Sequence, residues 1–437
     1  MPESEYASPF PEGMTAEAAA HELNLLGCKR REEDRFEMAE IFFRRALNIL
    51  PDNAPLWSNL ASALHGKGDH EGALLAVQRA FALLPDNMPT RMNLGYLLGS
   101  MGQTSRAISV LESILKDDPE NVRVRLDLAF QYLNSGDWER GLAEYEVRLE
   151  YQNFEIRQGR FPFPDWEGQD LNGKRLMVEG EQGIGDMILF SRYYEWLLDT
   201  YPKVQLYICM RPNLNNLFWH LTDDPRVTFV PGGVPFPECD YGCYLISIPR
   251  HAGSTPYSVP PPSWAVRSRI QAQEGIQQFP LPRLPRRARR VGICWTGNPK
   301  QRANAKRSIP LEMLLRISEN FSVDLYSLQC GPGQADIARL GAEALVHDLS
   351  PMITPDLVSA GMAMRELDLV ITCCTSVAHL AGTLGVPCWV LLCHDPYWIW
   401  LRDRIDSPWY DSVRLFRQPR PGDWASVMAA VDAALEE

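Results

Sequence analysis

A phrase of the form proline–acid–asparagine recurs three times at one fixed interval, and this period constrains the fold more than any other feature. The three copies begin at Pro51, Pro85 and Pro119, 34 residues apart. Glycines and leucines keep the same interval: Gly68, Gly102 and Gly136; Leu26, Leu60, Leu94 and Leu128. A period near 34 residues is typical of stacked helical hairpins. A chance run of amphipathic helices does not predict so many coincident positions.

Small residues recur where paired helices would approach closely, and bulky residues recur four positions after the small residues of the second helices. The small residues are Gly27, Ala61, Gly95 and Ala129 on the first helices and Ala39, Ala73 and Ala107 on the second; the bulky ones are Phe43, Val77, Leu111 and Tyr145. The pattern resembles the tetratricopeptide repeat (TPR). We expect four repeats over residues 20–153, after an N-terminal extension of residues 1–19.

Composition excludes several classes of protein. The chain has 437 residues, enough for two or three domains, of which 45% are hydrophobic and 22% charged. A net charge of −12 argues against a general nucleic-acid binder. No apolar run reaches the length of about 18 residues that a membrane span needs, and the N-terminus lacks a secretory pattern. We therefore expect a cytoplasmic protein.

Ten cysteines are scattered through the chain. Cys239 with Cys243, and Cys373 with Cys374, allow a zinc site, but no second ligand pair at a suitable spacing follows. We expect reduced, buried thiols and no metal ion.

Beyond the repeats the pattern changes to short apolar runs that alternate with helical stretches. Residues 154–173 predict a linker or docking segment, and the proline- and arginine-rich residues 259–289 predict a connector. Strands are expected at Arg175–Glu179, Val204–Met210, Val227–Val230 and Tyr244–Ile248, and then at Arg290–Trp295, Val323–Leu328, Leu369–Cys373, Cys388–Leu392 and Val413–Phe416. This alternation indicates parallel sheets flanked by helices. The predicted fold is a TPR α-solenoid followed by two Rossmann-like lobes, residues 174–258 and 290–437, across a cleft.

Three loops of these lobes contain candidate functional residues. Gly180–Asp186 lies between an expected strand and helix, and its glycines allow a close backbone approach to a ligand at the helix N-terminus. Asp186 lies at that terminus, where the alternative role is a simple helix cap. The second loop, Trp295–Pro299, is followed by Lys306 and Arg307, which suit a diphosphate; the alternative is a solvated basic loop.

The third loop passes from an expected buried strand into a helix that begins near Ser376. Thr375 and Ser376 offer hydroxyl groups beside free backbone amides, an arrangement that favours phosphate. His379 follows in the first turns of that helix, where it is either a ligand contact or a satisfied structural histidine.

Four motifs in a fixed order resemble the TPR-fused branch of the heptosyltransferase-like glycosyltransferases, whose GT-B architecture has two facing Rossmann-like lobes. They are Glu181-Gln182-Gly183-Ile184-Gly185-Asp186; Trp295 to Pro299 with Arg307 to Pro310; Thr375 through Gly382; and Ser407 to Tyr410 with Leu415 to Gln418. Cys374 departs from the family, which usually has aspartate there. This departure puts the donor preference or turnover in question.

The resemblance implies that Asp186 is a general base and that Lys306, with the Thr375–His379 helix start, binds the donor diphosphate. The other candidate substrate-binding residues are Gln182, Gly183, Gly185, Trp295, Gly297, Asn298, Arg307, Gln329 and Val377. The reaction implied is an inverting sugar transfer from a nucleoside-diphosphate sugar that needs no metal or other cofactor. The alternative function is a TPR interaction protein with degenerate transferase lobes.

Polar residues on the first helices of the repeats form a second candidate site. Asn24, Asn59, Asn93 and Asp127 follow the 34-residue interval, with Arg91 and Arg125. Concave walls of such solenoids commonly hold extended peptides. We expect these side chains to bind a protein or peptide acceptor; the alternative is that they only solvate the helix face.

Overall fold

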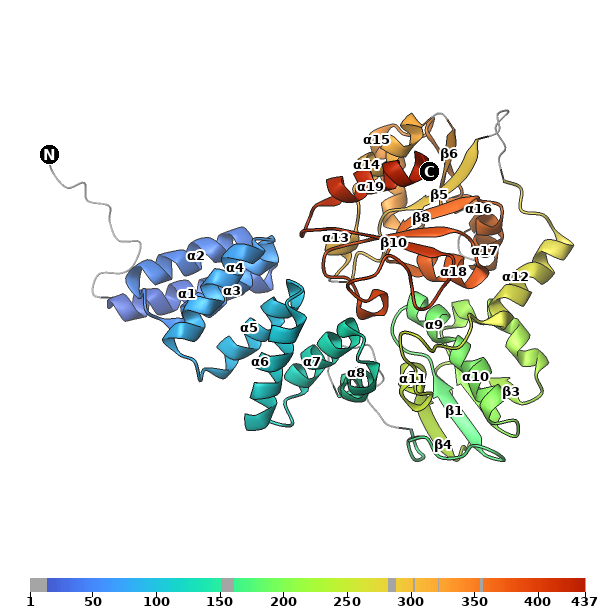
Figure 1. Ribbon diagram of the computed structural model, residues 1–437, viewed down its shortest axis with the longest axis horizontal. Helices are drawn as coiled ribbons and strands as arrows, with labels where there is room; N and C mark the ends of the chain where they lie inside the picture. Colours follow the sequence, from blue (N-terminus) through green and yellow to red (C-terminus); the bar gives the residue numbers. More distant parts are fainter. Residues whose placement is uncertain are drawn as a thin grey trace. The chain divides into compact units, whose positions relative to one another are not determined.

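The computed structural model describes residues 14–150, 161–281, 288–301, 303–320, 322–353 and 357–436. The chain divides into two compact units, Met1–Tyr132 and Leu133–Glu437, which are described separately (Figure 1). Parts of three predicted segments lie outside the described residues, namely 1–13 of the extension, 154–160 of the linker and 282–287 of the connector.

The first unit is built from helical hairpins. Its helices are α1 (Ala16–Glu32), α2 (Phe36–Ile49), α3 (Ala54–Lys67), α4 (His70–Leu83), α5 (Met88–Ser100), α6 (Thr104–Asp117) and most of α7 (Val122–Ser135). The repeated asparagine caps the first helix of each following repeat. The side chains of Asn53, Asn87 and Asn121 accept hydrogen bonds from backbone amides three residues on, at 3.0, 3.0 and 3.1 Å. Asparagine is among the best N-cap residues, which explains this element of the period.

The predicted pairing of small and bulky residues is confirmed within the hairpins. A Cβ atom on Gly27 would lie 2.6 Å from the Phe43 ring, and one on Gly95 would lie 2.7 Å from Leu111. Gly68 ends α3 with a left-handed backbone at φ 92°, which favours glycine. The period thus reflects close helix packing and helix termination.

The first lobe of the second unit is a parallel sheet in the order β3-β2-β1-β4. Its strands are β1 (Arg175–Glu179), β2 (Gln205–Cys209), β3 (Val227–Phe229) and β4 (Tyr241–Tyr244). The prediction of a strand at Tyr244–Ile248 is wrong, because the strand ends at Tyr244. The chain then turns into η4 (Leu245–Ser247) and α11 (Ile248–His251), where Pro249 occupies the first turn that proline tolerates.

The second lobe is a six-stranded parallel sheet in the order β10-β9-β8-β5-β6-β7. Its strands are β5 (Arg289–Cys294), β6 (Val323–Ser327), β7 (Val346–Asp348), β8 (Leu369–Cys373), β9 (Cys388–Leu392) and β10 (Val413–Arg417). Buried side chains of α14 (Leu311–Leu315), α15 (Ala335–Leu340) and α19 (Trp424–Glu436) share one core with this sheet. β7 was not predicted. Nor was α12 (Trp264–Ile276), which lies in the predicted connector and packs on α17 (Leu357–Arg365).

The described part of the predicted linker covers the open edge of the first sheet. The Trp166 amide donates to the Gly242 carbonyl at 2.8 Å, and the Gly242 amide donates to the Pro164 carbonyl at 2.9 Å. Phe161 packs directly over Gly242, where a Cβ atom would lie 2.2 Å from the ring. The segment therefore pairs with the outer edge of β4 through one short parallel bridge.

The last helix of the repeat pattern packs with the lobes. α8 (Trp138–Tyr145) and the 3₁₀ turn η1 (Glu146–Leu149) belong to the second unit. Trp138 is 1% exposed and stacks on Trp409, with ring centroids 5.0 Å apart. Its edge also meets Trp398 at 5.6 Å. The unit boundary thus precedes α8, inside the array predicted over residues 20–153.

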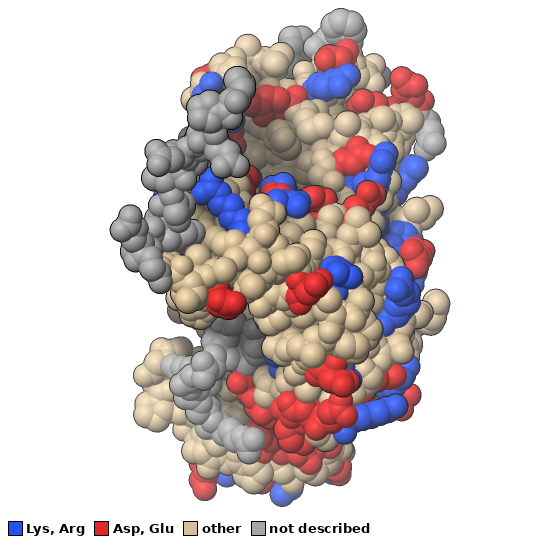
Figure 2. All heavy atoms as spheres, turned by 90° about the vertical axis from the view of Figure 1, so that its left-hand side faces the viewer, with Lys and Arg blue, Asp and Glu red and all other residues tan. Residues whose placement is uncertain are grey.

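Figure 2 shows acidic side chains gathered in the lower part of one face of the molecule and no basic area that spans this face. This distribution agrees with the net charge of −12.

We predict that Trp138→Ala destabilises the unit formed by Leu133–Glu437. Loss of a buried tryptophan leaves a cavity and costs about 3–5 kcal/mol of unfolding free energy. Guanidinium denaturation measures the change, with Trp219→Ala as control because Trp219 is 57% exposed. An effect no larger than that of the control would contradict the packing of α8 with the lobes.

Candidate functional site

The three predicted loops follow the strands at which the strand order of each sheet reverses. β1 pairs with β2 on one side and β4 on the other, and β5 pairs with β6 and β8. In open parallel sheets, ligands bind beyond the carboxyl ends of strands at such switch points. Gly180–Asp186 follows β1, Trp295–Pro299 follows β5, and Cys374–Ser376 follows β8. The topology therefore supports the predicted placement of the site.

Two of these loops meet through the helices that they start. α9 (Ile184–Phe190) packs on α18 (Ser376–Leu384), and Gly185 marks the contact (Figure 1). A Cβ atom on Gly185 would lie 2.8 Å from His379 Cδ2 and 3.4 Å from Ser376 Cα. At this point the lobes touch and are not separated by the open cleft that the sequence predicts. Only glycine permits this approach.

Asp186 is half-buried and does act as a helix cap, since its Oδ2 accepts from the Gly183 amide at 3.0 Å. Burial raises the pKa of Asp186 to about 6, and the charge of Glu181 adds to this rise. The Gly183 amide and Arg307 act in the opposite direction. A carboxylate with a pKa near 6 is well matched to accept a proton at neutral pH. Capping and proton acceptance are thus compatible.

Gln182 has a left-handed backbone at φ 62°, which is uncommon for a residue other than glycine. Its side-chain amide donates to the Tyr145 hydroxyl at 2.9 Å and accepts from the Tyr397 hydroxyl at 3.2 Å. Its carbonyl accepts from Arg211 at 2.8 Å. The Gln182 side chain, predicted to contact substrate, is therefore already held by two tyrosines. The sequence analysis did not identify Tyr145 and Tyr397 as residues of the site.

The second loop divides into supporting and exposed residues. Trp295 and Gln329 are 1% and 2% exposed, and Gln329 Oε1 accepts from the Trp295 and Thr296 amides at 3.1 and 3.0 Å. Both side chains support the loop from behind, and their contact with substrate stays a prediction. Asn298 and Lys306 are exposed.

Arg307 connects the second loop with the third. Its Nη1 donates to the Cys374 carbonyl at 2.8 Å, and its Nη2 lies against Gly297, where a Cβ atom would be 2.2 Å away. Lys306 lies near Asp395 and opposes the rise that burial causes in the pKa of that carboxyl. The two cations therefore differ: Arg307 orders the loops, and Lys306 is an exposed point charge.

The start of α18 has the features of an anion site. Thr375, the N-cap residue, makes no side-chain bond to the first turn, and its hydroxyl lies 3.3 Å from that of Thr372. Ser376 and Val377 are half-buried. An uncapped helix start leaves amides that favour negative charge.

His379 is 3% exposed, stacks on Trp400 at 5.3 Å, and lies 3.3 Å from the Tyr410 hydroxyl. Burial lowers its pKa to about 3, so the ring is neutral. These contacts match the structural alternative, and direct contact of His379 with a ligand stays a prediction.

Cys374, which replaces the aspartate of the resembling family, accepts a hydrogen bond at Sγ from Trp400 Nε1 at 3.0 Å. Burial raises the pKa of this thiol, and the charge of Asp186 raises it further. The thiol is therefore neutral and lies near the carboxylate of Asp186.

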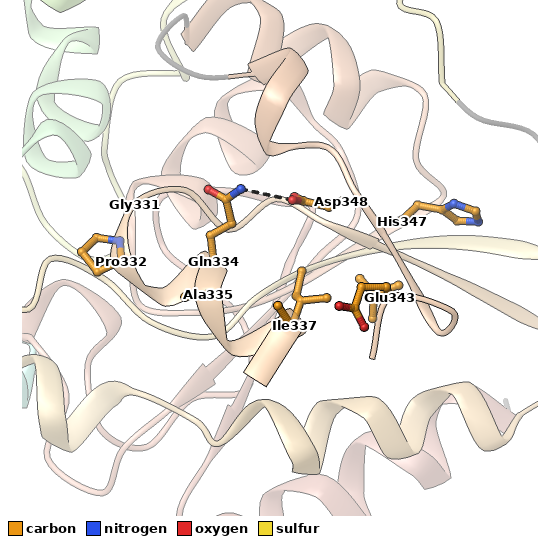
Figure 3. Close-up of a pocket in the computed structure, with 10 residues that line it drawn as sticks. Gly331, Pro332, Gln334, Ala335, Ile337, Glu343, His347 and Asp348 are labelled. Carbon is orange, nitrogen blue, oxygen red and sulfur yellow. Dashed lines mark hydrogen bonds between the residues drawn. The ribbon is translucent and has the colours of Figure 1, made fainter. Parts of the chain in front are cut away.

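A hollow of about 580 Å³ lies beside the second loop, between α15, β7 and the turn after β6 (Figure 3). Its polar side chains include Gln334 and Asp348, which point toward each other at 3.2 Å. Gly333 in the turn after β6 touches Thr296, since a Cβ atom there would lie 2.4 Å from Thr296 Cγ2. The hollow thus adjoins the second predicted loop, although no predicted site residue lines it.

The polar side chains that were predicted to bind an acceptor peptide form hydrogen bonds with one another and with other side chains of the first unit. Asn59 Nδ2 donates to Asn24 Oδ1 at 2.9 Å, and Asn93 Nδ2 donates to Ser58 at 2.7 Å. Asp127 accepts from Arg123 at 3.0 Å, and burial raises the pKa of this carboxyl. The asparagines therefore link neighbouring first helices, which uses part of their hydrogen-bonding capacity.

The fold is an array of TPR-like helical hairpins followed by two Rossmann-like lobes, as the sequence predicts. Residues 99–158 match the tetratricopeptide repeat family. Within the described ranges, each helix is too short or too polar to cross a membrane.

Three known proteins illustrate the similarity. Protein FlbA of Caulobacter vibrioides is 26% identical over 323 residues, which cover 68% of this chain and 52% of that protein, so the chain spans about half of its relative. ADP-heptose LPS heptosyltransferase II of E. coli is similar with a TM-score of 0.41 and 13% identity, over 60% of this chain and 98% of that one. The second TPR domain of human RPAP3, in complex with an HSP70 peptide, gives a TM-score of 0.26 and 20% identity, over 27% and 98%.

We predict that Asp186 makes stability fall as pH rises from about 4 to about 6. The carboxyl ionises near pH 4 when unfolded but near pH 6 when folded, so unfolding releases a proton within this window. The loss should be about 2 kcal/mol, allowing for partial solvent exposure, and should vanish in Asp186→Asn. Urea denaturation at several pH values measures both curves. Parallel curves would show that Asp186 has an ordinary pKa.

Proposed function

We propose that the protein is a glycosyltransferase that moves a sugar from a nucleoside-diphosphate sugar to an acceptor hydroxyl. One observation carries the proposal: an acid of raised pKa, Asp186, lies at the contact between the lobes, beside an uncapped helix start and under the influence of the Arg307 charge. Sugar transfer needs a base near the acceptor and positive charge near the leaving diphosphate. The motif resemblance points to the same chemistry.

In this proposal Asp186 takes the proton of the acceptor hydroxyl as the hydroxyl oxygen attacks the anomeric carbon. The bond from that carbon to the diphosphate breaks, and the amides of the α18 start, with Lys306, stabilise the charge that develops. Attack from the side opposite the leaving group inverts the anomeric centre. These cationic and amide donors stand in for a metal ion, so the reaction is proposed to be metal-independent.

The hollow beside the second loop supplies a place for the nucleoside. A diphosphate at the start of α18 would lie close to Thr296, and the turn that touches Thr296 forms one wall of the hollow. Asp348 already accepts from Gln334 and Ser350, while the Gln334 side chain keeps a second amide hydrogen and its oxygen for ribose hydroxyls or a base edge. This placement deepens the donor site beyond the three loops.

The repeats are proposed to hold a protein or peptide acceptor, because their first helices carry a row of half-buried amides and arginines. Backbone recognition by amides suits an acceptor that is read with little sequence preference. The ten free cysteines agree with a proposed cytoplasmic location.

A second candidate is an interaction protein whose lobes bind a nucleotide without transferring sugar. Cys374 favours it, because a neutral thiol replaces a carboxylate of the resembling family and is bonded to Trp400. Nucleotide binding without turnover would select this candidate.

We predict that a nucleoside diphosphate binds the second lobe and that Lys306→Ala weakens its affinity about 30-fold or more. Loss of a charged phosphate partner costs roughly 2–5 kcal/mol of binding. Thermal stabilisation by UDP, GDP, ADP and CMP sugars identifies the nucleotide, and calorimetry then measures the affinity. Lys300→Ala, which removes another exposed lysine of the same loop, is the matched control. Equal affinities for Lys306→Ala and the parent would remove Lys306 from the site.

We also predict that Asp186→Asn lowers turnover about 100-fold or more, because it removes the proton acceptor. Asparagine caps helices about as well as aspartate, so fold and donor affinity should persist. Steady-state kinetics with the identified donor measures turnover, and circular dichroism checks the fold. Parental turnover in the variant would leave Asp186 as a cap alone.

A further inference from the structure

An arginine from the end of the repeat pattern is buried in the wall of the candidate site. Arg148, in η1, is 0% exposed, and its Nε and Nη2 donate to the two carboxylate oxygens of Glu181 at 3.1 and 2.6 Å. Glu181 is itself 4% exposed and also accepts from the Ile246 amide at 3.2 Å. Nη2 of Arg148 donates further to the Ser247 hydroxyl at 2.8 Å. The pair is thus bidentate and enclosed.

A second contact from the same helix end reaches the next residue of the loop. The Tyr145 hydroxyl lies 2.9 Å from Gln182 Nε2 and 3.0 Å from the Tyr397 hydroxyl. Tyr397 follows β9 in the second lobe. Burial raises the pKa of Tyr145 to about 12, so its hydroxyl remains protonated at physiological pH. Three segments that are far apart in sequence therefore share one hydrogen-bonded cluster.

We propose that Tyr145, the last residue of α8, and Arg148, in the turn η1 that follows, are positioning residues that hold the Glu181–Asp186 loop for the transfer reaction. The inference rests on the proposed function, and neither residue is given a contact with substrate. The contacts hold two consecutive residues of the loop, and Asp186 follows four residues after Gln182 in the first turn of α9.

The backbone of Gln182 explains why the loop needs such support. A left-handed conformation in a residue other than glycine persists only where the surroundings impose it. The Tyr145 and Tyr397 hydroxyls form hydrogen bonds with the nitrogen and the oxygen of the Gln182 side-chain amide. Arg211 donates a hydrogen bond to the backbone carbonyl of Gln182. Release of the Tyr145 bond would let this residue relax, and the start of α9 would move with it.

The inference changes what the repeats are for. A chain cut at residue 153, the expected end of the array, would lose Trp138, Tyr145 and Arg148 together. Such a chain would lack part of the site's support as well as its repeats. The last helix of the array belongs structurally to the transferase lobes.

The test compares full-length variants that remove one contact each. Tyr145→Phe removes only the hydroxyl. Tyr193→Phe is the matched control, because Tyr193 is also buried and its hydroxyl lies 2.7 Å from Ser254, away from the loop. A third variant joins Arg148→Met to Glu181→Met, which removes both fully buried charges of the pair. Glu146, whose side chain is 25% exposed and which also pairs with Arg148 at 2.7 Å, keeps the hydrogen bond that the Ser247 hydroxyl donates to it.

Two measurements are made on each chain: amide hydrogen exchange of residues 182–187, and kcat, KM and affinity with the donor identified by thermal stabilisation. Tyr145→Phe and the double variant should exchange about 10-fold faster in the loop. Their kcat should fall about 10-fold, with nucleotide affinity within about twofold of the parent. Tyr193→Phe should change neither.

Parental exchange and kcat in Tyr145→Phe would overturn the inference, as would equal effects in Tyr193→Phe. Faster exchange with parental kcat would also overturn it, because a merely structural bond behaves that way. A parent chain that binds the nucleotide but transfers no sugar overturns the proposed function instead. In that case the exchange result alone decides whether these residues hold the loop.

Discussion

Two opposite charges enclosed together, Arg148 and Glu181, link the end of the repeat pattern to the first loop of the α/β lobes. Removing one partner of such a buried pair leaves an uncompensated charge, which costs several kcal/mol, so neither segment is placed without the other. Glu181 immediately precedes Gln182, and the chain then enters α9 through Gly183 and Gly185. The position of α9 against α18, and thus the meeting of the two lobes, follows from a loop fixed at its start by an arginine 33 residues earlier.

The electrostatics of the candidate site depend on the partial burial of Asp186 and on a small number of charges close to it. The pKa of Asp186 is raised by burial and by the charge of Glu181, and it is lowered by the Gly183 amide and by Arg307. Because Arg148 is paired with Glu181, the site is spared the full repulsion of a second free carboxylate. Cys374 acts in the same direction, since a carboxylate at that position would add a third negative charge near Asp186. The departure from the family pattern thus has an electrostatic consequence that does not by itself abolish base function.

Much of the architecture was predictable because it is written in local patterns. β1, β8 and β9 have the bounds expected from short buried apolar runs, and the 34-residue interval predicted the repeat helices. β7 escaped prediction because its three residues, Val346 to Asp348, include a single apolar side chain, and α12 was hidden by prolines on both sides. The roles of Tyr145, Arg148 and Tyr397 were not predictable, because each depends on a partner brought close only by the tertiary fold. His379 was judged from its place in a helix, whereas burial decides its role.

The edge bridge at Gly242 has a consequence for the young chain during synthesis. An uncovered strand edge pairs readily with other chains, and proteins hide such edges because exposure leads to aggregation. Here the residues that cover the edge, Phe161 to Trp166, precede β4 in the chain and leave the ribosome first. They are therefore available to pair with β4 when its edge forms. Pro162 and Pro164 have no amide hydrogen, which limits the hydrogen bonds that another strand could form along this segment. The segment that follows the repeats therefore guards the first lobe against misassembly while the second lobe is still being made.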